Sequence, residues 1–235
     1  MALRSYRDGS LLSFQKLGSL MEEIYGTPYL HVHRATFHSA LCDEAIRLGV
    51  EFQLGSTVTG IDFENTAVKV QGHADVAADF ILGADGLKSV CRQALLGRPD
   101  PPHQTGDMAY RFVIPTSEMK KYNELIDFAT IPSFNDWAGP GGHAVGYLIA
   151  SGTLYNMVIV VADELPDNVY RIAGNVNEMQ NRFKDWNPMF KHLLGLASEV
   201  SLGKLQNSVE METWTHPNGT FALLGDACHA TLPYL

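Results

Sequence analysis

Two short segments of this sequence place a carboxylate directly after an apolar run. In GADGLKSVCR, residues 83–92, the carboxylate is Asp85. In GDACHATLP, residues 225–233, it is Asp226, and His229 follows three positions later. Open α/β sheets bind ligands at the carboxyl ends of their strands, so a carboxylate at such a position is a candidate ligand contact. Two of them in one chain favour a shared ligand.

Both segments also have a structural explanation. Asp85 and Ser89 are suitable capping residues for the helix that VCRQALL predicts, and a strand, a D-G turn and a helix follow one another in many α/β proteins. The first segment is therefore open to either interpretation. A second capped turn explains Asp226 less completely, because His229 and Pro233 accompany it at short spacing.

The segment HVHR, residues 31–34, suggests two further kinds of chemistry. His31 and His33 alternate as on one face of a strand, which a metal site could use. A third ligand at suitable spacing is not evident, and His38 falls inside the following helix, so we predict no metal site. Arg34 is better placed to contact a phosphate or a ribityl chain, because its fork of donors suits an anion.

The glycine-rich run GPGGHAVG, residues 139–146, resembles a phosphate-binding loop only in its glycine content. A phosphate loop follows a strand and opens a helix, whereas this run precedes a strand. We therefore predict a hairpin connection.

The elements that position these residues follow from the hydrophobic pattern. Residues 36–48 have helical spacing and Gly49 follows them, which predicts an amphipathic helix. Residues 50–72 alternate apolar and polar side chains between glycines, as short strands and turns do. VAADFILGADG predicts a buried strand that ends at Gly83. The proline-rich residues 97–104 suit neither a helix nor a central strand, and they predict a domain crossing.

The pattern beyond this crossing is mixed. Strands are predicted in MAYRFVIP, GGHAVGYLIA and TLYNMVIVVAD, and helices in VNEMQNRFKDW and MFKHLLGLAS. A last strand, Phe221 to Leu224, breaks at Gly225 into a turn that should open a helix. The predicted fold class is therefore α/β, with an α+β middle section.

Composition excludes several classes of function. The 235 residues are 46% hydrophobic, which supports a globular core, and the net charge of −9 without any basic run argues against a nucleic-acid partner. No stretch approaches the roughly 18 apolar residues of a membrane span, and we expect a cytoplasmic protein. The three cysteines are far apart and odd in number, so we expect reduced, mostly buried thiols.

Taken in order, VHRATFHSAL, ILGADGLKSVCR, AYRFVIP and ALLGDACHATLP resemble the salicylate-hydroxylase-like branch of the single-component FAD-dependent aromatic-ring monooxygenases. The resemblance runs nearly from end to end. The family's D-G motif is matched at Gly83, Ala84, Asp85, Gly86, Ser89 and Arg92, with Cys91 where an aliphatic residue is usual. Its G-D motif is matched at Gly225, Asp226, Ala227, His229 and Pro233.

This resemblance implies a cofactor and a reaction. Asp226 would accept hydrogen bonds from the ribityl chain of FAD, Arg34 would contact the FAD, and Asp85 would lie near the pyrophosphate and the incoming nicotinamide nucleotide. Gly86, Gly225 and His229 complete the implied cofactor-binding residues. NAD(P)H would reduce the flavin, oxygen would add to give a C4a-hydroperoxide, and one oxygen atom would pass to a small phenolic or salicylate-like substrate.

The same resemblance suggests catalytic residues. Some fungal members are similar in using an arginine and a tyrosine on the middle-section strands, for which Arg111 and Tyr147 are the candidates here. The alternative is an ordinary surface salt bridge for the arginine and a core position for the tyrosine. Pro233 matches a proline whose backbone carbonyl lies beside the reacting carbon.

The resemblance also implies a division into domains. Residues 1–98 and 213–235 would form part of a Rossmann-like FAD-binding domain, and residues 99–212 a substrate domain with a mixed or antiparallel sheet. The strands that end at Gly83 and Gly225 should then share one sheet.

Two parts of the family pattern have no match. No G-x-G-x-x-G turn precedes Arg34, and the helix that should follow the G-D motif is cut short at Leu235. We therefore expect this polypeptide to bind FAD weakly or not at all. A non-catalytic relict that binds a small molecule or a partner is the alternative to an enzyme, and the oligomeric state is left open.

Overall fold

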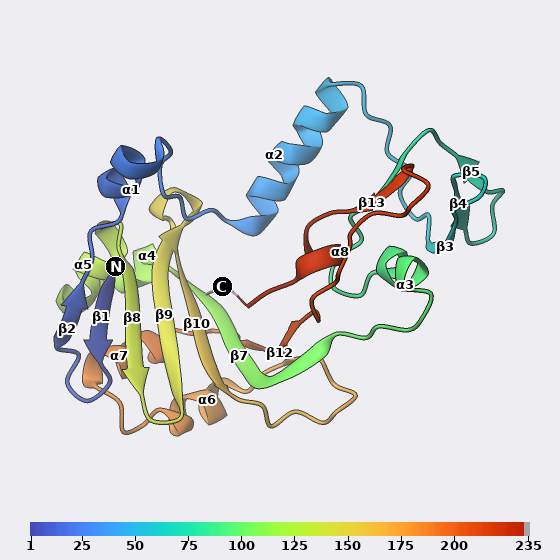
Figure 1. Cartoon of the computed structure of the whole chain (residues 1–235). Helices are drawn as coiled ribbons and strands as arrows, with labels where there is room; N and C mark the ends of the chain where they lie inside the picture. Colours follow the sequence, from blue (N-terminus) through green and yellow to red (C-terminus); the bar gives the residue numbers. More distant parts are fainter. Residues whose placement is uncertain (233–235) are drawn as a thin grey trace. The chain divides into compact units, whose positions relative to one another are not determined.

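The computed structural model describes residues 1–232, which form two compact units (Figure 1). The first unit comprises Met1–Val50 and Gly106–Lys204, and the second comprises Glu51–Thr105 and the chain from Leu205 onward. The packing therefore groups the first 50 residues with the middle section and places the crossings near residues 105 and 205. Which residues belong to a FAD-binding domain stays a prediction, because packing alone does not test it.

The first unit is built on a mixed sheet with the strand order β11-β12-β7-β10-β9-β8-β1-β2. Strands β7, β10, β9 and β8 pair antiparallel, and β1 pairs with β8 in parallel. The strands are β1 (Ala2–Ser5), β2 (Leu11–Phe14), β7 (His103–Pro115), β8 (Phe134–Gly139), β9 (Gly142–Ile149), β10 (Leu154–Ala162), β11 (Arg171–Ala173) and β12 (Ser201–Asn207). The ends of β7 and β12 belong to the second unit, so these two strands carry the chain between the units.

One face of this sheet carries the main core. On β7 the side chains of Tyr110, Phe112 and Ile114 are buried and alternate with exposed positions, as a strand with one covered face requires. Residues of four helices join the same apolar cluster. These helices are α4 (Thr116–Met119), α5 (Ile126–Thr130), α6 (Val176–Arg182) and α7 (Pro188–Gly195). The side chains of Asn175 and Asn187 cap α6 and α7 by accepting backbone N–H groups.

The predicted strands of the middle section are confirmed as β7, β9 and β10, and the predicted helices as the shorter α6 and α7. The hairpin prediction for GPGGHAVG is also confirmed. Gly139 on β8 pairs with Gly142 on β9, and Gly141 between them has a φ of +72°, which a glycine adopts without strain. Two 3₁₀ turns, η1 (Asn123–Leu125) and η2 (Ala150–Gly152), complete this section.

Helices α1 (Gly18–Tyr25) and α2 (Arg34–Arg47) come before this section. The predicted helix over residues 36–48 is α2, so its existence is confirmed. Its apolar face, however, is not covered by the described residues: Phe37 and Leu41 are 51% and 56% exposed, and no residue of α2 is buried. None of the helices within residues 1–232 has the length and apolar character needed to cross a membrane.

The core of the first unit leaves no room beside Gly146 on β9. A Cβ at this position would lie 2.5 Å from Tyr155 Oη and 2.7 Å from Met157 Sδ, and both neighbours are fully buried. We expect Gly146→Ala to lower the free energy of unfolding by about 1–3 kcal/mol, because overpacking forces neighbours out of their rotamers. Urea unfolding measures this.

The control for this prediction is Gly195→Ala at the end of α7, where a Cβ meets nothing within 4 Å. We expect this variant to be as stable as the parent or slightly more stable, since alanine has fewer unfolded conformations than glycine. Equal stability of the two variants would contradict the packing argument.

The second unit contains two small sheets. A three-stranded antiparallel sheet consists of β3 (Val58–Asp62), β4 (Ala67–Val70) and β5 (Val76–Ala77), and a two-stranded sheet consists of β6 (Ile81–Gly83) and β13 (Phe221–Leu223). Helices α3 (Val90–Leu96) and α8 (Asp226–His229) follow β6 and β13. With the first unit, this architecture confirms the predicted α/β class.

The strand predicted to be buried is β6, and that prediction is wrong in part. Ile81 is buried, but Leu82 and Phe80 are 53% and 52% exposed. The reason is that only one face of the two-stranded sheet packs against the small core of this unit, so alternate side chains point away from it.

Candidate functional site

The two carboxylate segments follow neighbouring strands of one sheet. Strands β6 and β13 pair in parallel, with Leu223 opposite Gly83, and the N–H of Leu224 donates to the carbonyl of Gly83 at 2.9 Å. This confirms that the strands ending at Gly83 and before Gly225 share a sheet. Because the strands are parallel, both D-G and G-D turns leave the same edge, where α/β sheets bind ligands.

The carboxylate of Asp85 is directed at the start of α3. Its Oδ2 accepts the N–H groups of Val90 and Cys91 at 2.8 and 3.1 Å, and its Oδ1 accepts the hydroxyl of Ser89. Ser89 Oγ in turn accepts the N–H of Arg92 at 2.8 Å. The predicted capping by Asp85 and Ser89 is therefore confirmed. Gly86 has a φ of +79°, which allows the tight turn between them.

Gly83 allows α3 to approach β6 closely. A Cβ at Gly83 would lie 2.7 Å from Cys91 Cβ and 2.9 Å from Leu223 Cδ2, so any side chain there would push the helix off the strand. Cys91 and Cys228 are free and buried, as predicted, whereas Cys42 is partly exposed. Burial, followed by the nearby Asp85, raises the pKa of the Cys91 thiol to about 12. Cys91 is therefore a packing residue rather than a nucleophile.

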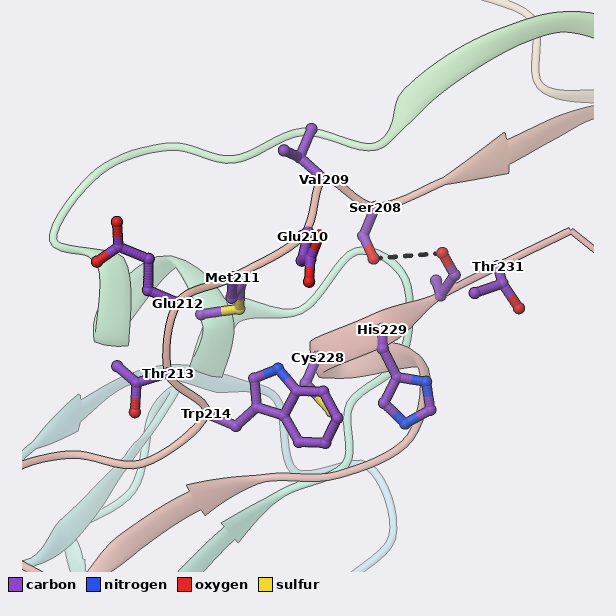
Figure 2. Close-up of a pocket in the computed structure, with 11 residues that line it drawn as sticks. Ser208, Val209, Glu210, Met211, Glu212, Thr213, Trp214, Cys228, His229 and Thr231 are labelled. Carbon is purple, nitrogen blue, oxygen red and sulfur yellow. Dashed lines mark hydrogen bonds between the residues drawn. The ribbon is translucent and has the colours of Figure 1, made fainter. Parts of the chain in front are cut away.

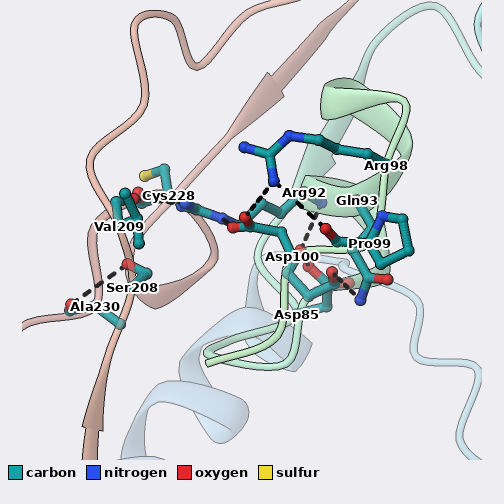
Figure 3. A network of polar contacts seen from close by, with 11 residues as sticks. Asp85, Arg92, Gln93, Arg98, Pro99, Asp100, Ser208, Val209, Cys228 and Ala230 are labelled. Carbon is teal, nitrogen blue, oxygen red and sulfur yellow. Dashed lines mark hydrogen bonds and ion pairs between the residues drawn. The ribbon is translucent and has the colours of Figure 1, made fainter. Parts of the chain in front are cut away.

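Arg92 joins the two segments (Figure 3). Its guanidinium is almost fully buried, pairs with Asp100 at 2.6 Å, and donates to the carbonyls of Cys228 at 2.9 Å and Val209 at 2.5 Å. Asp100 also pairs with the exposed Arg98 at 3.1 Å. A buried guanidinium needs such a complete set of acceptors. Arg92 thus fixes the D-G segment against the backbone of α8.

Gly225 and Asp226 form the turn after β13. Gly225 has φ 60° and ψ −138°, a conformation that is essentially restricted to glycine, and its carbonyl accepts the N–H groups of Cys228 and His229. Asp226 is exposed, and within residues 1–232 its carboxylate takes part in no hydrogen bond or ion pair. Unlike Asp85, Asp226 therefore has both oxygens available to a ligand.

A pocket of about 700 Å³ lies at the end of α8, lined by residues 208–214 and 228–231, whereas Gly225 and Asp226 are not among its lining residues (Figure 2). The rings of Trp214 and His229 are stacked, with their centroids 5.0 Å apart. Figure 2 shows both rings on the wall of the pocket next to Cys228. His229, a predicted site residue, therefore lines a hollow of the size of small-molecule sites, and Trp214 is a member of that wall which the sequence did not reveal.

In the first unit, Arg111 and Tyr147 lie on the same face of the sheet. Arg111 on β7 pairs with Val158 on β10, and Tyr147 on β9 pairs with Asn156 on β10. Two positions apart on one strand, residues 156 and 158 share a face, so their partners do too. This face, opposite the helical core, is called the open face below.

Each of these two side chains affects the pKa of the other, as expected if they lie close together. Burial and the nearby Tyr29 raise the pKa of Tyr147, while Arg111 and a hydrogen bond with Asn156 oppose that rise. Although Arg111 is exposed, partial desolvation lowers its pKa, and the positive charges of Arg171 and Arg34 lower it further. Tyr147 therefore keeps its proton at neutral pH.

His31, which the sequence suggested only as a metal ligand, is a neighbour of Tyr147. Its ring lies 4.4 Å from the Tyr147 ring, and Phe134 stacks on the same tyrosine at 5.5 Å. His31 Nε2 is buried without a hydrogen-bond partner in the described part of the chain, and burial lowers the pKa of the imidazole. Within residues 1–232 no group of three potential metal ligands occurs.

Known proteins are similar to this chain in sequence and in fold, although no family model matches it. It is 34% identical over its whole length to the FAD-dependent monooxygenase OpS4 of Beauveria bassiana (strain ARSEF 2860), of which it covers 56%. It is 30% identical, over 99% of its length, to 3-amino-4-hydroxybenzoate 2-monooxygenase of Streptomyces cremeus, of which it covers 55%. A substrate complex of salicylate hydroxylase superposes on 99% of the chain with a TM-score of 0.79 and 25% identity, and 57% of that structure is covered.

The homologues of this chain are FAD-dependent monooxygenases, and they match it over its whole length. The chain spans about half the length of the curated relatives it matches. The resemblance predicted from the D-G and G-D motifs is thereby confirmed.

The chemistry of the residues in this chain fits a bound flavin. The exposed Asp226 carboxylate is an acceptor suited to ribityl hydroxyls, and the Gly225 turn leaves open space, since a Cβ there would meet nothing within 4 Å. Arg34 is exposed at the first position of α2 and is available to an anion. Pro233 lies outside the described residues.

Proposed function

We propose that the protein is a FAD- and NAD(P)H-dependent monooxygenase that hydroxylates an aromatic substrate of the phenolic or salicylate-like class. The observation that carries this proposal is the parallel pairing of β6 with β13, which brings the D-G and G-D segments to one sheet edge. The relatives named above include a FAD-dependent monooxygenase, a 3-amino-4-hydroxybenzoate 2-monooxygenase and a salicylate hydroxylase, which supports the same reaction class.

In this proposal the second unit contributes cofactor contacts. Asp226 accepts hydrogen bonds from the ribityl hydroxyls, and the Gly225 backbone lets the chain approach the cofactor closely. Asp85 acts by holding the start of α3 in place, because both of its oxygens are already engaged there. The bound flavin supplies the redox and oxygen-transfer chemistry.

The open face of the first unit contributes substrate contacts. The guanidinium of Arg111 favours the ionised form of a phenol, which is the more nucleophilic form. Tyr147 is protonated and can donate a hydrogen bond to the same oxygen, while Asn156 and the rings of His31 and Phe134 fix its orientation. Arg111 and Tyr147 are therefore the proposed catalytic residues.

The proposal is tested by titrating the purified protein with FAD up to millimolar concentration, because this polypeptide is expected to bind FAD weakly, and then adding NADPH, oxygen and salicylate. We expect NADPH consumption that depends on the aromatic compound, and a product heavier by one oxygen atom in mass spectrometry. A protein that binds salicylate but forms no hydroxylated product with FAD and NADPH present would instead be a non-catalytic binding protein.

A further inference from the structure

A second pocket, of about 480 Å³, lies in the first unit and is lined by residues of β1, β2, α5 and β8. It is on the face of the sheet away from Tyr147. Asn135, which lines the pocket, follows Phe134 on β8, and the ring of Phe134 stacks on that of Tyr147. Successive residues of a strand point to opposite faces, so Asn135 points away from the open face. Most of the pocket wall is apolar, with the side chains of Leu11, Phe14, Phe128, Ile131 and Met189.

Arg4 on β1 places a guanidinium in this wall. Its Nε donates to Oδ1 of Asn135 at 3.0 Å, and Asn135 is only 1% exposed. Its Cζ lies 5.3 Å from the centroid of the Phe128 ring, a cation–π contact. The group is therefore held from two sides. Nη1 makes one long hydrogen bond, of 3.4 Å, to the carbonyl of Gly9, and within residues 1–232 Nη2 has no acceptor. The guanidinium thus keeps donors that a ligand can use.

Asp127 on α5 adds the opposite charge to the same pocket. Its side chain is exposed and, in the described part of the chain, takes part in no hydrogen bond or ion pair, not even with Arg4. The other carboxylate in the wall, that of Glu124, already accepts His192 Nδ1 at 3.0 Å. A cation and an anion therefore line one pocket without neutralising each other.

This charge arrangement selects the class of ligand. A simple anion drawn to Arg4 is repelled by Asp127, and a simple cation drawn to Asp127 is repelled by Arg4. A molecule that carries an ammonium and a carboxylate is attracted by both side chains. The apolar wall further requires that such a molecule has an apolar part.

We propose that this pocket binds a free α-amino acid with an apolar side chain. The ligand's carboxylate accepts two N–H groups of Arg4, its ammonium donates to Asp127, and its side chain packs against the apolar wall. The inference goes beyond the proposed oxygenation and does not depend on it, since neither Arg111 nor Tyr147 lines the pocket.

The test compares three compounds that share one side chain. L-Phenylalanine carries both charges, N-acetyl-L-phenylalanine lacks the ammonium, and L-phenylalaninamide lacks the carboxylate. Binding of each to the purified protein is measured by calorimetry. We expect phenylalanine to bind about tenfold more tightly than either analogue, because each analogue loses one charged hydrogen-bond partner and meets one repulsive charge.

Two variants assign the charges to their partners. Arg4→Met should weaken phenylalanine binding about tenfold or more, and it should leave phenylalaninamide bound at least as tightly as by the parent. Asp127→Asn should weaken phenylalanine binding and leave N-acetylphenylalanine bound at least as tightly. The controls are Arg7→Met and Asp43→Asn, which make the same charge changes at exposed positions outside the pocket and should bind all three compounds as the parent does.

Asp127→Asn is the decisive variant. Arg4→Met also removes the donor to the buried Asn135, whereas the exposed side chain of Asp127 can be replaced without loss of a described contact. Phenylalanine binding that is no tighter than that of both analogues would overturn the inference. Unchanged phenylalanine binding by Asp127→Asn, or an equal loss of all three compounds, would do the same. Because no measurement uses FAD, NADPH or a phenol, its failure is distinguishable from failure of the proposed oxygenation.

Discussion

Replacing Arg92 by methionine is expected to lower the free energy of unfolding of the second unit by about 3 kcal/mol or more. The buried guanidinium is the common partner of Asp100 and of the carbonyls of Cys228 and Val209. Its removal therefore takes a donor from three acceptors, one in a buried and two in partly buried hydrogen bonds. Arg98 still neutralises Asp100, which places the loss at the lower end of the range for a broken buried ion pair.

The matched control is Arg98→Met. Both arginines pair with the same carboxylate, but the side chain of Arg98 is 63% exposed and that of Arg92 is 3% exposed. A surface ion pair contributes about 1 kcal/mol at most, so Arg98→Met should be nearly as stable as the parent. Hydrogen exchange of the amides in α3 and β13 measures the second unit separately from the first. Similar protection in both variants would show that Arg92 does not hold the segments together.

The structure explains why part of this site could be predicted from the sequence. Capping by Asp85 and Ser89 depends on residues within one turn of α3, so the local pattern is sufficient to predict it. The hairpin at Gly141 and the alternating strands of the middle section are local in the same sense.

Contacts between segments that are distant in the sequence were harder to predict. Arg92 was recognised only as a motif position, because its acceptors Val209 and Cys228 are 117 and 136 positions away and offer backbone carbonyls, which carry no sequence signal. The strands β1 and β2 were missed for another reason. Each strand is only four residues long, and neither ALRS nor LLSF alternates regularly between apolar and polar residues, which is the pattern by which a strand is recognised.

Burial was predicted less well than secondary structure. The apolar spacing of α2 was read correctly as a helix, yet Phe37 and Leu41 are more than half exposed in the described chain. Periodicity identifies which side chains share a face, but it does not supply the surface that covers them.

Replacing Arg111 by methionine is expected to have the largest effect on activity. In the proposed reaction this guanidinium stabilises the ionised phenol, and removing one such group from an active site typically slows turnover about 100-fold or more. The loss should shrink as the pH rises, because hydroxide then ionises the phenol without help from the protein. The neighbouring Tyr147 does not replace it, since its raised pKa keeps it neutral over the same range.

Ionisation of a bound phenol can be measured without turnover. The phenolate of 4-nitrophenol is coloured and its phenol is not, so its absorbance in the presence of excess protein gives the pKa of the bound molecule. We expect the parent protein to lower this pKa, and Arg111→Met to bring it back up by about one unit, which corresponds to about 1.4 kcal/mol of lost charge stabilisation. Arg7→Met, with the same change of charge at an exposed site, should leave it unaltered. If 4-nitrophenol bound to Arg111→Met has the same pKa as 4-nitrophenol bound to the parent, the guanidinium does not stabilise the phenolate and the proposed catalytic role of Arg111 is wrong.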